Sequence, residues 1–136
     1  MDDIFEKIAR HEVPADIIYE DEDTVAFLDI MPDVPGHTLV IPKKKSRNIF
    51  DIDMESWSKV AETARKIAPV VRDSVGATGM QIRMNNEPSA GQVVFHLHLH
   101  LIPFHEGQEK NFPEKLPSTK EERTQLAEKL RALLQH

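Results

Sequence analysis

The stretch Phe95-His96-Leu97-His98-Leu99-His100-Leu101 alternates large apolar side chains with histidines, and it decides how the rest of the chain is interpreted. Successive side chains of a β-strand point to opposite faces, so one face would carry the three imidazoles and the other face the apolar groups. Same-face neighbours would lie roughly 6.6 to 6.8 Å apart. Burial of the apolar face would fix the register of the strand. We therefore expect a strand over about residues 93–102 that presents three side chains titrating near neutral pH.

A row of three histidines has four interpretations. It can be the polar face of an ordinary strand, or a metal site, because neutral imidazoles are common zinc ligands. No carboxylate or cysteine motif accompanies the histidines, and the chain contains no cysteine. The row can also supply acid and base groups to another nucleophile, or one imidazole can itself attack an electrophile while its neighbours handle protons. The spacing alone leaves all four open.

The polar segment just before the histidines favours phosphate chemistry. Residues 85–92 read Asn-Asn-Glu-Pro-Ser-Ala-Gly-Gln. Gly91 allows backbone N–H groups to approach an anion closely, and the side-chain amides of Asn85 and Gln92 can donate further hydrogen bonds. An ordinary polar loop has the same composition, so the segment indicates a phosphate site only in combination with the histidines beside it.

The flanking sequence predicts an α+β fold, in which about five strands form one mostly antiparallel sheet with helices packed on it. Hydrophobic alternation and turn residues predict further strands over residues 17–20, 24–30, 37–41 and 80–84. On the second of these, one face would carry Val25, Phe27 and Asp29, and the other would carry Ala26, Leu28 and Ile30.

Three helices are expected. Asp3 and Glu6 form a capping pattern for a helix through about residue 10. Asp53 is the expected cap of a long helix that Pro69 would kink or shorten. The buried stripe of this helix would be Met54, Trp57, Ala61, Ala64, Ala68 and Val71. A C-terminal helix would begin with the capping pair Ser118 and Glu121 and carry an apolar side made of Leu126, Leu130, Leu133 and Leu134.

Composition and charge bound the class of protein. The 136 residues suffice for one domain, 40% of them are apolar, and no apolar run approaches the roughly 18 residues that span a bilayer. The N-terminus is acidic, unlike a secretory signal. A count of 23 acidic against 17 basic residues gives a net charge of −6, which argues against nucleic-acid binding. The one basic cluster, residues 43–47, is expected to be a solvated loop. We expect a single-domain cytoplasmic protein without membrane or nucleic-acid partners.

Several stretches together resemble one known family. Gly91-Gln92, followed shortly by a histidine–apolar pair repeated three times, is similar to the motif of the histidine triad (HIT) family. The resemblance spans about residues 3–105 and includes Asp3-Ile4-Phe5, Lys7-Ile8, Val13-Pro14-Ala15, Ala26-Phe27-Leu28-Asp29 and the run from Pro35-Gly36-His37 to Ile41-Pro42-Lys43. These stretches resemble the Hint-like branch and its bacterial relatives. The resemblance implies one HIT-like domain over residues 1–136, with a C-terminal helical extension over about 118–135.

The resemblance also implies an activity: a nucleotide-binding hydrolase that cleaves the bond at the α-phosphorus of purine nucleoside phosphoramidates or related esters. His98 would be the nucleophile and would form a nucleotidyl-histidine. His100 would contact the phosphate and help to protonate the leaving group. His96 and His37 would be supporting histidines that orient the nucleophile.

The substrate-binding residues follow from the same resemblance. Asp29 would hold the ribose hydroxyls, and Asn85 would lie near the phosphate together with Gly91, Gln92 and Val93. The base pocket would include Ile4, Phe5, Ile8, Phe27, Leu28 and Ile30. Many relatives have serine or threonine where this chain has Val93. One hydroxyl donor is therefore lost, while the backbone N–H remains.

The implied chemistry requires no metal and no cofactor. A neutral imidazole is a competent nucleophile near pH 7, and a covalent intermediate replaces one difficult step by two easier ones. Family members commonly pair, so we expect a homodimer to which the long helix could supply an interface. Two other functions stay open: a dinucleoside polyphosphate hydrolase, and a nucleotide-binding or metal-binding module with little turnover.

Overall fold

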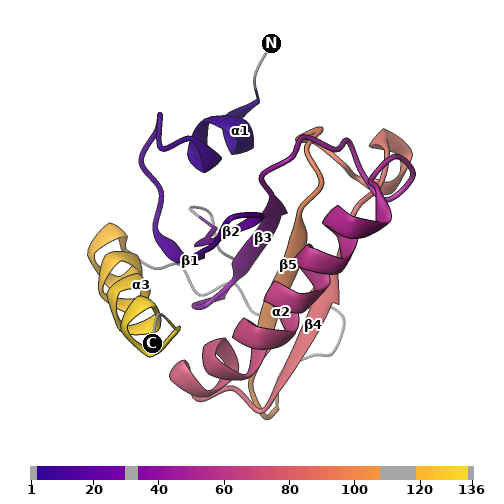
Figure 1. Cartoon of the computed structure of the whole chain (residues 1–136). Helices are drawn as coiled ribbons and strands as arrows, with labels where there is room; N and C mark the ends of the chain where they lie inside the picture. Colours follow the sequence, from indigo (N-terminus) through magenta and orange to yellow (C-terminus); the bar gives the residue numbers. More distant parts are fainter. Residues whose placement is uncertain (1–2, 30–33, 108–118, 135–136) are drawn as a thin grey trace.

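A five-stranded antiparallel sheet lies at the centre of the molecule (Figure 1). The computed structural model describes residues 3–29, 34–107 and 119–134, and the elements named below lie within them. In spatial order the strands are β1 (Ile17–Glu20), β2 (Thr24–Leu28), β3 (Thr38–Pro42), β5 (Leu99–Phe104) and β4 (Gly79–Arg83). The helices are α1 (Ile4–Ala9), α2 (Met54–Ser74), α3 (Lys120–Leu134) and the short 3₁₀ turn η1 (Pro88–Ala90). The α+β fold expected from the sequence is confirmed.

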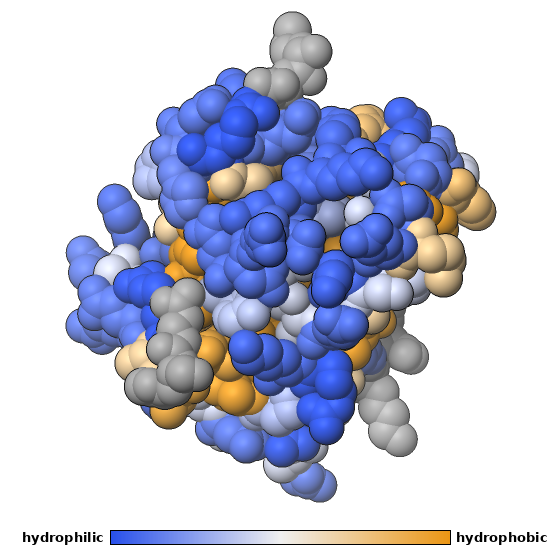
Figure 2. Space-filling view, viewed as in Figure 1, coloured by the Kyte–Doolittle hydropathy of each residue, from blue (hydrophilic) through white to orange (hydrophobic). Residues whose placement is uncertain are grey.

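The two faces of the sheet are covered differently. Ala26 and Leu28 of β2 face a core that includes side chains of α2 and α3. Val25 and Phe27 face the other side, where α1 packs, so the alternation predicted for this strand is confirmed. Figure 1 shows α1 near one end of the sheet, separate from α2 and α3. In the same view, Figure 2 shows a mostly hydrophilic surface with apolar side chains visible between α3 and α2. Within the described ranges, none of the helices is both long enough and apolar enough to cross a bilayer.

The histidine-bearing strand starts later than predicted. β5 begins at Leu99, so His100 alone of the three histidines lies in regular strand structure. The reason is non-local: the imidazole of His96 binds the carbonyl of Pro42 (2.8 Å), and the N–H of Leu97 donates to the carbonyl of Ser46 (2.8 Å). These bonds take the place of the backbone hydrogen bonds that would otherwise extend the pairing of β3 with β5.

The strand also ends later than predicted, at Phe104, and passes through Pro103. The pairing of β5 with β3 covers only residues 99–101, whereas its pairing with β4 continues through Pro103 to Phe104. Pro103 therefore has one strand neighbour, a setting in which the missing N–H of proline is tolerated. The other predicted strands are present with small shifts: 24–30 ends at residue 28, 37–41 becomes 38–42, and 80–84 becomes 79–83.

Helix α2 has its predicted cap and part of its predicted buried stripe. Ser56 N–H donates to Asp53 Oδ1 (2.8 Å), and the helix continues past Pro69 to Ser74. Of the predicted stripe, Ala64 and Val71 are buried and Trp57 and Ala68 pack against the core, whereas Met54 and Ala61 are exposed, against the prediction. The buried residues are Val60, Thr63, Ala64, Ile67 and Val71. The buried side thus also includes the β-branched residues Val60, Thr63 and Ile67, which the prediction missed.

The capping pair of α3 is shifted by one residue from the prediction. Glu122 N–H donates to Thr119 Oγ1 (3.1 Å), and Thr119 N–H donates to Glu122 Oε1 (2.9 Å). Ser118 lies outside the described residues. The helix buries Ala127, Leu130 and Leu134, whereas Leu133 is 53% exposed, against the prediction.

Candidate active site

The main cavity of about 420 Å³ lies on the face of the sheet that α1 covers. Its volume falls within the range of small-molecule sites. Most of the lining is apolar, and the polar exceptions are Asp29, His98 and His100. The full lining is Ile4, Phe5, Ile8, Val13, Pro14, Ala15, Phe27, Asp29, Leu39, Val93, Val94, His98 and His100.

The three histidines face a common side, as the alternation predicted, although regular strand structure begins only at Leu99. The rings of His98 and His100 lie 4.9 Å apart between centroids. The ring of Phe5 packs edge-on against His98 at 4.9 Å and against His96 at 6.3 Å. The intervening residues Leu97, Leu99 and Leu101 belong to the core on the opposite side. Burial of these leucines therefore holds the histidine row in place.

The hydrogen bonding of His98 fixes which of its ring nitrogens carries the lone pair. His98 Nδ1 lies 2.8 Å from the main-chain carbonyl oxygen of His96. A carbonyl oxygen only accepts hydrogen bonds, so Nδ1 must carry the proton. In the neutral ring the lone pair is then on Nε2. Burial is the largest influence on this ring, and the pKa of His98 is lowered from its ordinary value of 6.5. His98 is therefore mostly neutral at pH 7, as a nucleophile must be.

A further set of contacts links His100 through His37 to Asp29. His37 Nε2 and His100 Nδ1 are hydrogen-bonded at 2.9 Å, and His37 Nδ1 lies 3.7 Å from Asp29 Oδ2. Burial, followed by the charges of His98 and His37, lowers the pKa of His100 to about 4. Asp29 N–H donates to the carbonyl of His37 (3.0 Å), which ties the end of β2 to the start of β3. Asp29 is thus the group beside His37 that can steady its ring.

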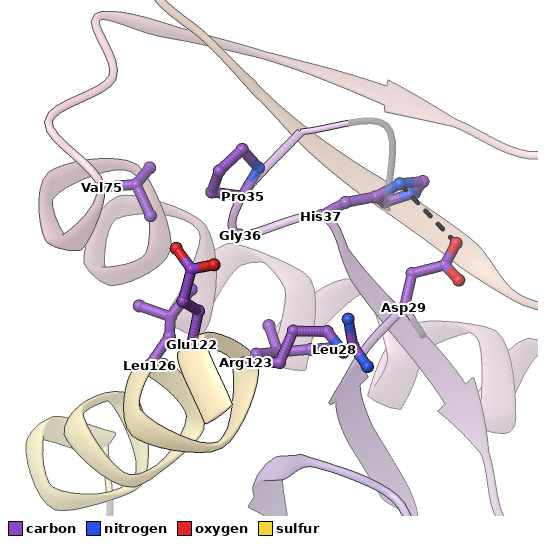
Figure 3. A pocket seen from close by; sticks show the side chains of 9 residues that line it. All are labelled: Leu28, Asp29, Pro35, Gly36, His37, Val75, Glu122, Arg123 and Leu126. Atoms are coloured by element: carbon purple, nitrogen blue, oxygen red, sulfur yellow. Dashed lines mark ion pairs between the residues drawn. The ribbon is translucent and has the colours of Figure 1, made fainter. Parts of the chain in front are cut away.

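Asp29 and His37 also border a second cavity, of about 280 Å³ (Figure 3). This cavity is lined by Leu28, Pro35, Gly36, Val75, Glu122, Arg123 and Leu126 as well. Figure 3 shows the His37 ring directed toward the Asp29 carboxylate, along the dashed line. Leu28 lines this second cavity and not the main one, because it lies on the opposite face of β2 from Phe27.

The predicted base-pocket residues are mostly brought together. Ile4, Phe5, Ile8 and Phe27 line the main cavity. Leu28 does not, and Ile30 lies outside the described residues. Sequence reasoning missed several other lining residues: Val13, Pro14, Ala15, Leu39 and Val94. One signal for Leu39 existed, because Leu39 pairs directly with Phe27 across β2 and β3 and must share its face.

In the loop before the histidines, the side chain of Gln92 is hydrogen-bonded to neighbouring segments of the protein. Its side chain is 3% exposed and makes four hydrogen bonds. Oε1 accepts from Asn48 Nδ2 and from Glu87 N, and Nε2 donates to the carbonyls of Arg47 and Val94. We expected this amide to donate to an anion, but its donors and acceptors already form hydrogen bonds within the protein.

Asn85 and Gly91 shape the same loop. Asn85 Nδ2 donates to the carbonyl of Ala90 (2.7 Å). Gly91 has φ +89°, and a Cβ at this position would lie 3.3 Å from Asn85 Nδ2. Glycine is needed there, because other residues rarely adopt this conformation and a side chain would crowd the asparagine. Val93, at 81% exposed, stands at the rim of the main cavity.

Among the residues that the structure describes, two clusters of side chains have the donor types that metals use. One ring nitrogen each of His37 and His100 and a carboxylate oxygen of Asp29 lie within 4.8 Å of one another. Asp3, Glu6 and His96 form the second cluster. Lys45 already pairs with both carboxylates of the second cluster, so the first is the better candidate for a cation.

Comparisons with known proteins are consistent with one another. Residues 10–107 match the HIT domain family. A Hit-like protein from Bartonella henselae is 44% identical with a TM-score of 0.87, and the match covers 98% of this chain and 97% of that one. A Zn-bound histidine triad family protein from Mycobacterium smegmatis is 36% identical with a TM-score of 0.86, covering 99% and 94%. The purine nucleoside phosphoramidase of Escherichia coli is 36% identical over 102 residues, which are 73% of this chain and 84% of that protein.

Proposed function

This chain belongs to the histidine triad (HIT) family, and from that premise we propose that it is a nucleotide-binding hydrolase acting on purine nucleoside phosphoramidates or related esters. The observation that carries the proposal is the state of His98. Its ring is neutral at pH 7, its Nδ1 proton is bound by the His96 carbonyl, and it lines a cavity of about 420 Å³. The E. coli relative, a purine nucleoside phosphoramidase, supports this substrate class.

The reaction has two displacements at the α-phosphorus. The lone pair of His98 Nε2 attacks phosphorus, a P–N bond to His98 forms, and the bond to the leaving amine breaks as that nitrogen takes up a proton. Water then attacks the nucleotidyl-histidine, the bond to His98 breaks, and a nucleoside monophosphate leaves with the neutral imidazole restored. Each displacement is easier than direct attack of water on the original substrate.

His100 is suited to manage the proton of the leaving group. Its pKa of about 4 in the free protein makes it neutral at pH 7. A bound phosphate places negative charge beside the ring, and an opposite charge raises the pKa of an imidazole. Substrate binding itself therefore moves His100 toward the form that can donate. Its hydrogen bond to His37 offers a route for the proton.

The cavity supports recognition of the nucleoside. Ile4, Phe5, Ile8 and Phe27 offer an apolar wall for the base, and Asp29 is a carboxylate that can accept from ribose hydroxyls. Of the four residues expected near the phosphate, only Val93 lines the cavity. The backbone N–H groups of Gly91 and Gln92 donate to the carbonyls of Pro88 and Glu87, so we propose that Asn85, Gly91 and Gln92 hold the loop that carries Val93. For Gln92 we propose a supporting role, because its side chain is bonded within the loop.

The test is hydrolysis of adenosine 5′-phosphoramidate in the presence and absence of a chelator. We expect release of AMP that survives chelation and falls by about 10³-fold or more in His98→Ala. The matched control is His11→Asn, an exposed histidine at φ +59° whose conformation asparagine tolerates. Tight binding of AMP without turnover would instead identify a binding module.

Zinc binding is a second candidate function for the same site. His37, His100 and Asp29 form the donor set described above, and two imidazoles with a carboxylate are a common zinc environment. The M. smegmatis relative is Zn-bound. Turnover abolished by the chelator and restored by zinc would favour this candidate over the metal-free reaction.

We also propose that the protein is a homodimer. β4 is an edge of the sheet, and its Ile82 is 56% exposed. An unpaired strand edge with an exposed apolar side chain is a ready pairing surface. Sedimentation at micromolar concentration should show twice the chain mass of 15.5 kDa, and a single species of 15.5 kDa would contradict the dimer.

A further inference from the structure

We infer that Lys45 is a positioning residue for the active site: its ammonium clamps the start of α1 to the loop that follows β3. Lys45 lies in the loop after β3, and its Nζ pairs with Asp3 Oδ2 and with Glu6 Oε1 (3.1 Å). Asp3 and Glu6 are the two side chains of the α1 capping box. One cation therefore holds both carboxylates that define where the helix begins.

Helix α1 needs such an anchor. It has six residues, and isolated helices shorter than roughly 12 residues are marginal in water. The same helix supplies the apolar wall of the main cavity through Ile4, Phe5 and Ile8. A displaced α1 would take this wall away from a bound nucleotide. The clamp thus connects a surface ion pair to the shape of the binding site.

The clamp also reaches the histidine row. Asp3 Oδ2, the oxygen that Lys45 holds, lies 3.5 Å from His96 Nδ1. His96 is completely buried, and its Nε2 must donate to the carbonyl of Pro42 (2.8 Å), since that oxygen only accepts. The hydrogen bond to Pro42 therefore holds the Nε2 side of the His96 ring, while its Nδ1 side lies against the Asp3 carboxylate without a hydrogen bond. The carbonyl of His96 in turn accepts the Nδ1 proton of His98. A continuous set of contacts runs from Lys45 through Asp3 and His96 to His98.

Charge favours the clamp over a metal ion at this place. Asp3, Glu6 and His96 have the donor types of a metal cluster. The ammonium of Lys45 already supplies positive charge to both carboxylates. Partial burial opposes the charge on Lys45, but its hydrogen bonds to Asp3 and Glu6 outweigh this and raise the pKa of Lys45 above 10.5. Lys45 is thus charged at every pH at which the enzyme would work.

The test compares Lys45→Met with Lys44→Met. Lys44 is the neighbouring lysine, and its ammonium pairs with Asp53 at the cap of α2, away from the cavity. We expect Lys45→Met to speed hydrogen exchange of the α1 amides by about tenfold, because local opening becomes easier, with no such change in Lys44→Met. Lys45→Arg should restore slow exchange, because a guanidinium can also bind two carboxylates.

The kinetic consequence rests on the proposed function. Loss of the α1 wall removes binding shared by substrate and transition state, so KM for adenosine 5′-phosphoramidate should rise about tenfold while kcat changes by less than about threefold. A role in stability alone would leave KM and kcat of the folded protein unchanged. Should Lys45→Met unfold the protein, Lys45→Gln, which keeps one donor group, takes its place.

Equal exchange at α1 and equal KM in the Lys45 and Lys44 variants would overturn the inference. The exchange comparison needs no substrate. If the wild-type protein neither hydrolyses the phosphoramidate nor binds AMP, the proposed function fails, and the exchange rates still decide whether Lys45 clamps α1.

Discussion

Replacing Gln92 by alanine separates a structural role of this residue from a role in binding phosphate. The four hydrogen bonds of the Gln92 side chain join three segments of chain: residues 47–48, the start of η1 at Glu87, and Val94. Each such bond contributes roughly 1 kcal/mol net, so removal of all four should cost about 4 kcal/mol. This is a large share of the roughly 5 to 15 kcal/mol that stabilises a typical domain.

Urea unfolding at pH 7 measures the effect. With a slope of roughly 2 kcal/mol per M, the midpoint should fall by about 2 M while the slope stays constant. The matched control is Gln125→Ala, an exposed position on α3, which should change stability by no more than about 0.5 kcal/mol. A change below about 1 kcal/mol in Gln92→Ala, together with a large loss of AMP affinity, would show that the amide serves the ligand and refute the reasoning.

Three further predictions concern protonation and backbone conformation. Because the pKa of His98 is lowered from 6.5 and the neutral ring is the nucleophile, the acid limb of the kcat/KM profile should have its midpoint below pH 6.5; a midpoint above 6.5 would contradict the burial argument. For His100 the folded pKa of about 4 lies below the unfolded 6.5, so the unfolded state binds more protons and the free energy of unfolding should decrease as pH falls from 6.5 to 4. In His100→Asn, thermal unfolding should show a weaker dependence of stability on pH between 6.5 and 4, and an unchanged dependence would mean that other groups cause it. Gly91→Ala should cost about 1 to 2 kcal/mol in urea unfolding, because of φ +89° and the close Asn85, whereas Gly79→Ala, without positive φ or close atoms, should cost less; equal costs would argue against backbone strain at Gly91.

Features that depend on residues close in sequence could be predicted. The cap of α1 involves Asp3 and Glu6, three residues apart, and it forms as the pattern indicated. The alternation around His98 placed the leucines in the core and the imidazoles together, because side-chain direction in an extended chain is a local property.

Features that depend on distant partners could not be predicted. The start of β5 is set by bonds from His96 and Leu97 to Pro42 and Ser46. The hydrogen bonds of the Gln92 amide involve residues 47 and 48, which are more than 40 positions earlier in the chain. The contact of Asp3 with His96 joins residues near the start and the end of the stretch that resembles the family. For α2, the predicted stripe included the buried Ala64 and Val71 but missed Val60, Thr63 and Ile67, because only the sheet decides how far the buried side of an amphipathic helix extends.

The stereochemical course at phosphorus tests most directly whether His98 forms a covalent intermediate. The substrate is an adenosine thiophosphoramidate of defined configuration at the α-phosphorus, hydrolysed in water enriched in oxygen-18. Each in-line displacement inverts the configuration, so attack by His98 followed by attack of water should give a product with net retention. Net inversion would mean that water attacks the substrate directly, and it would contradict the nucleophilic role of His98.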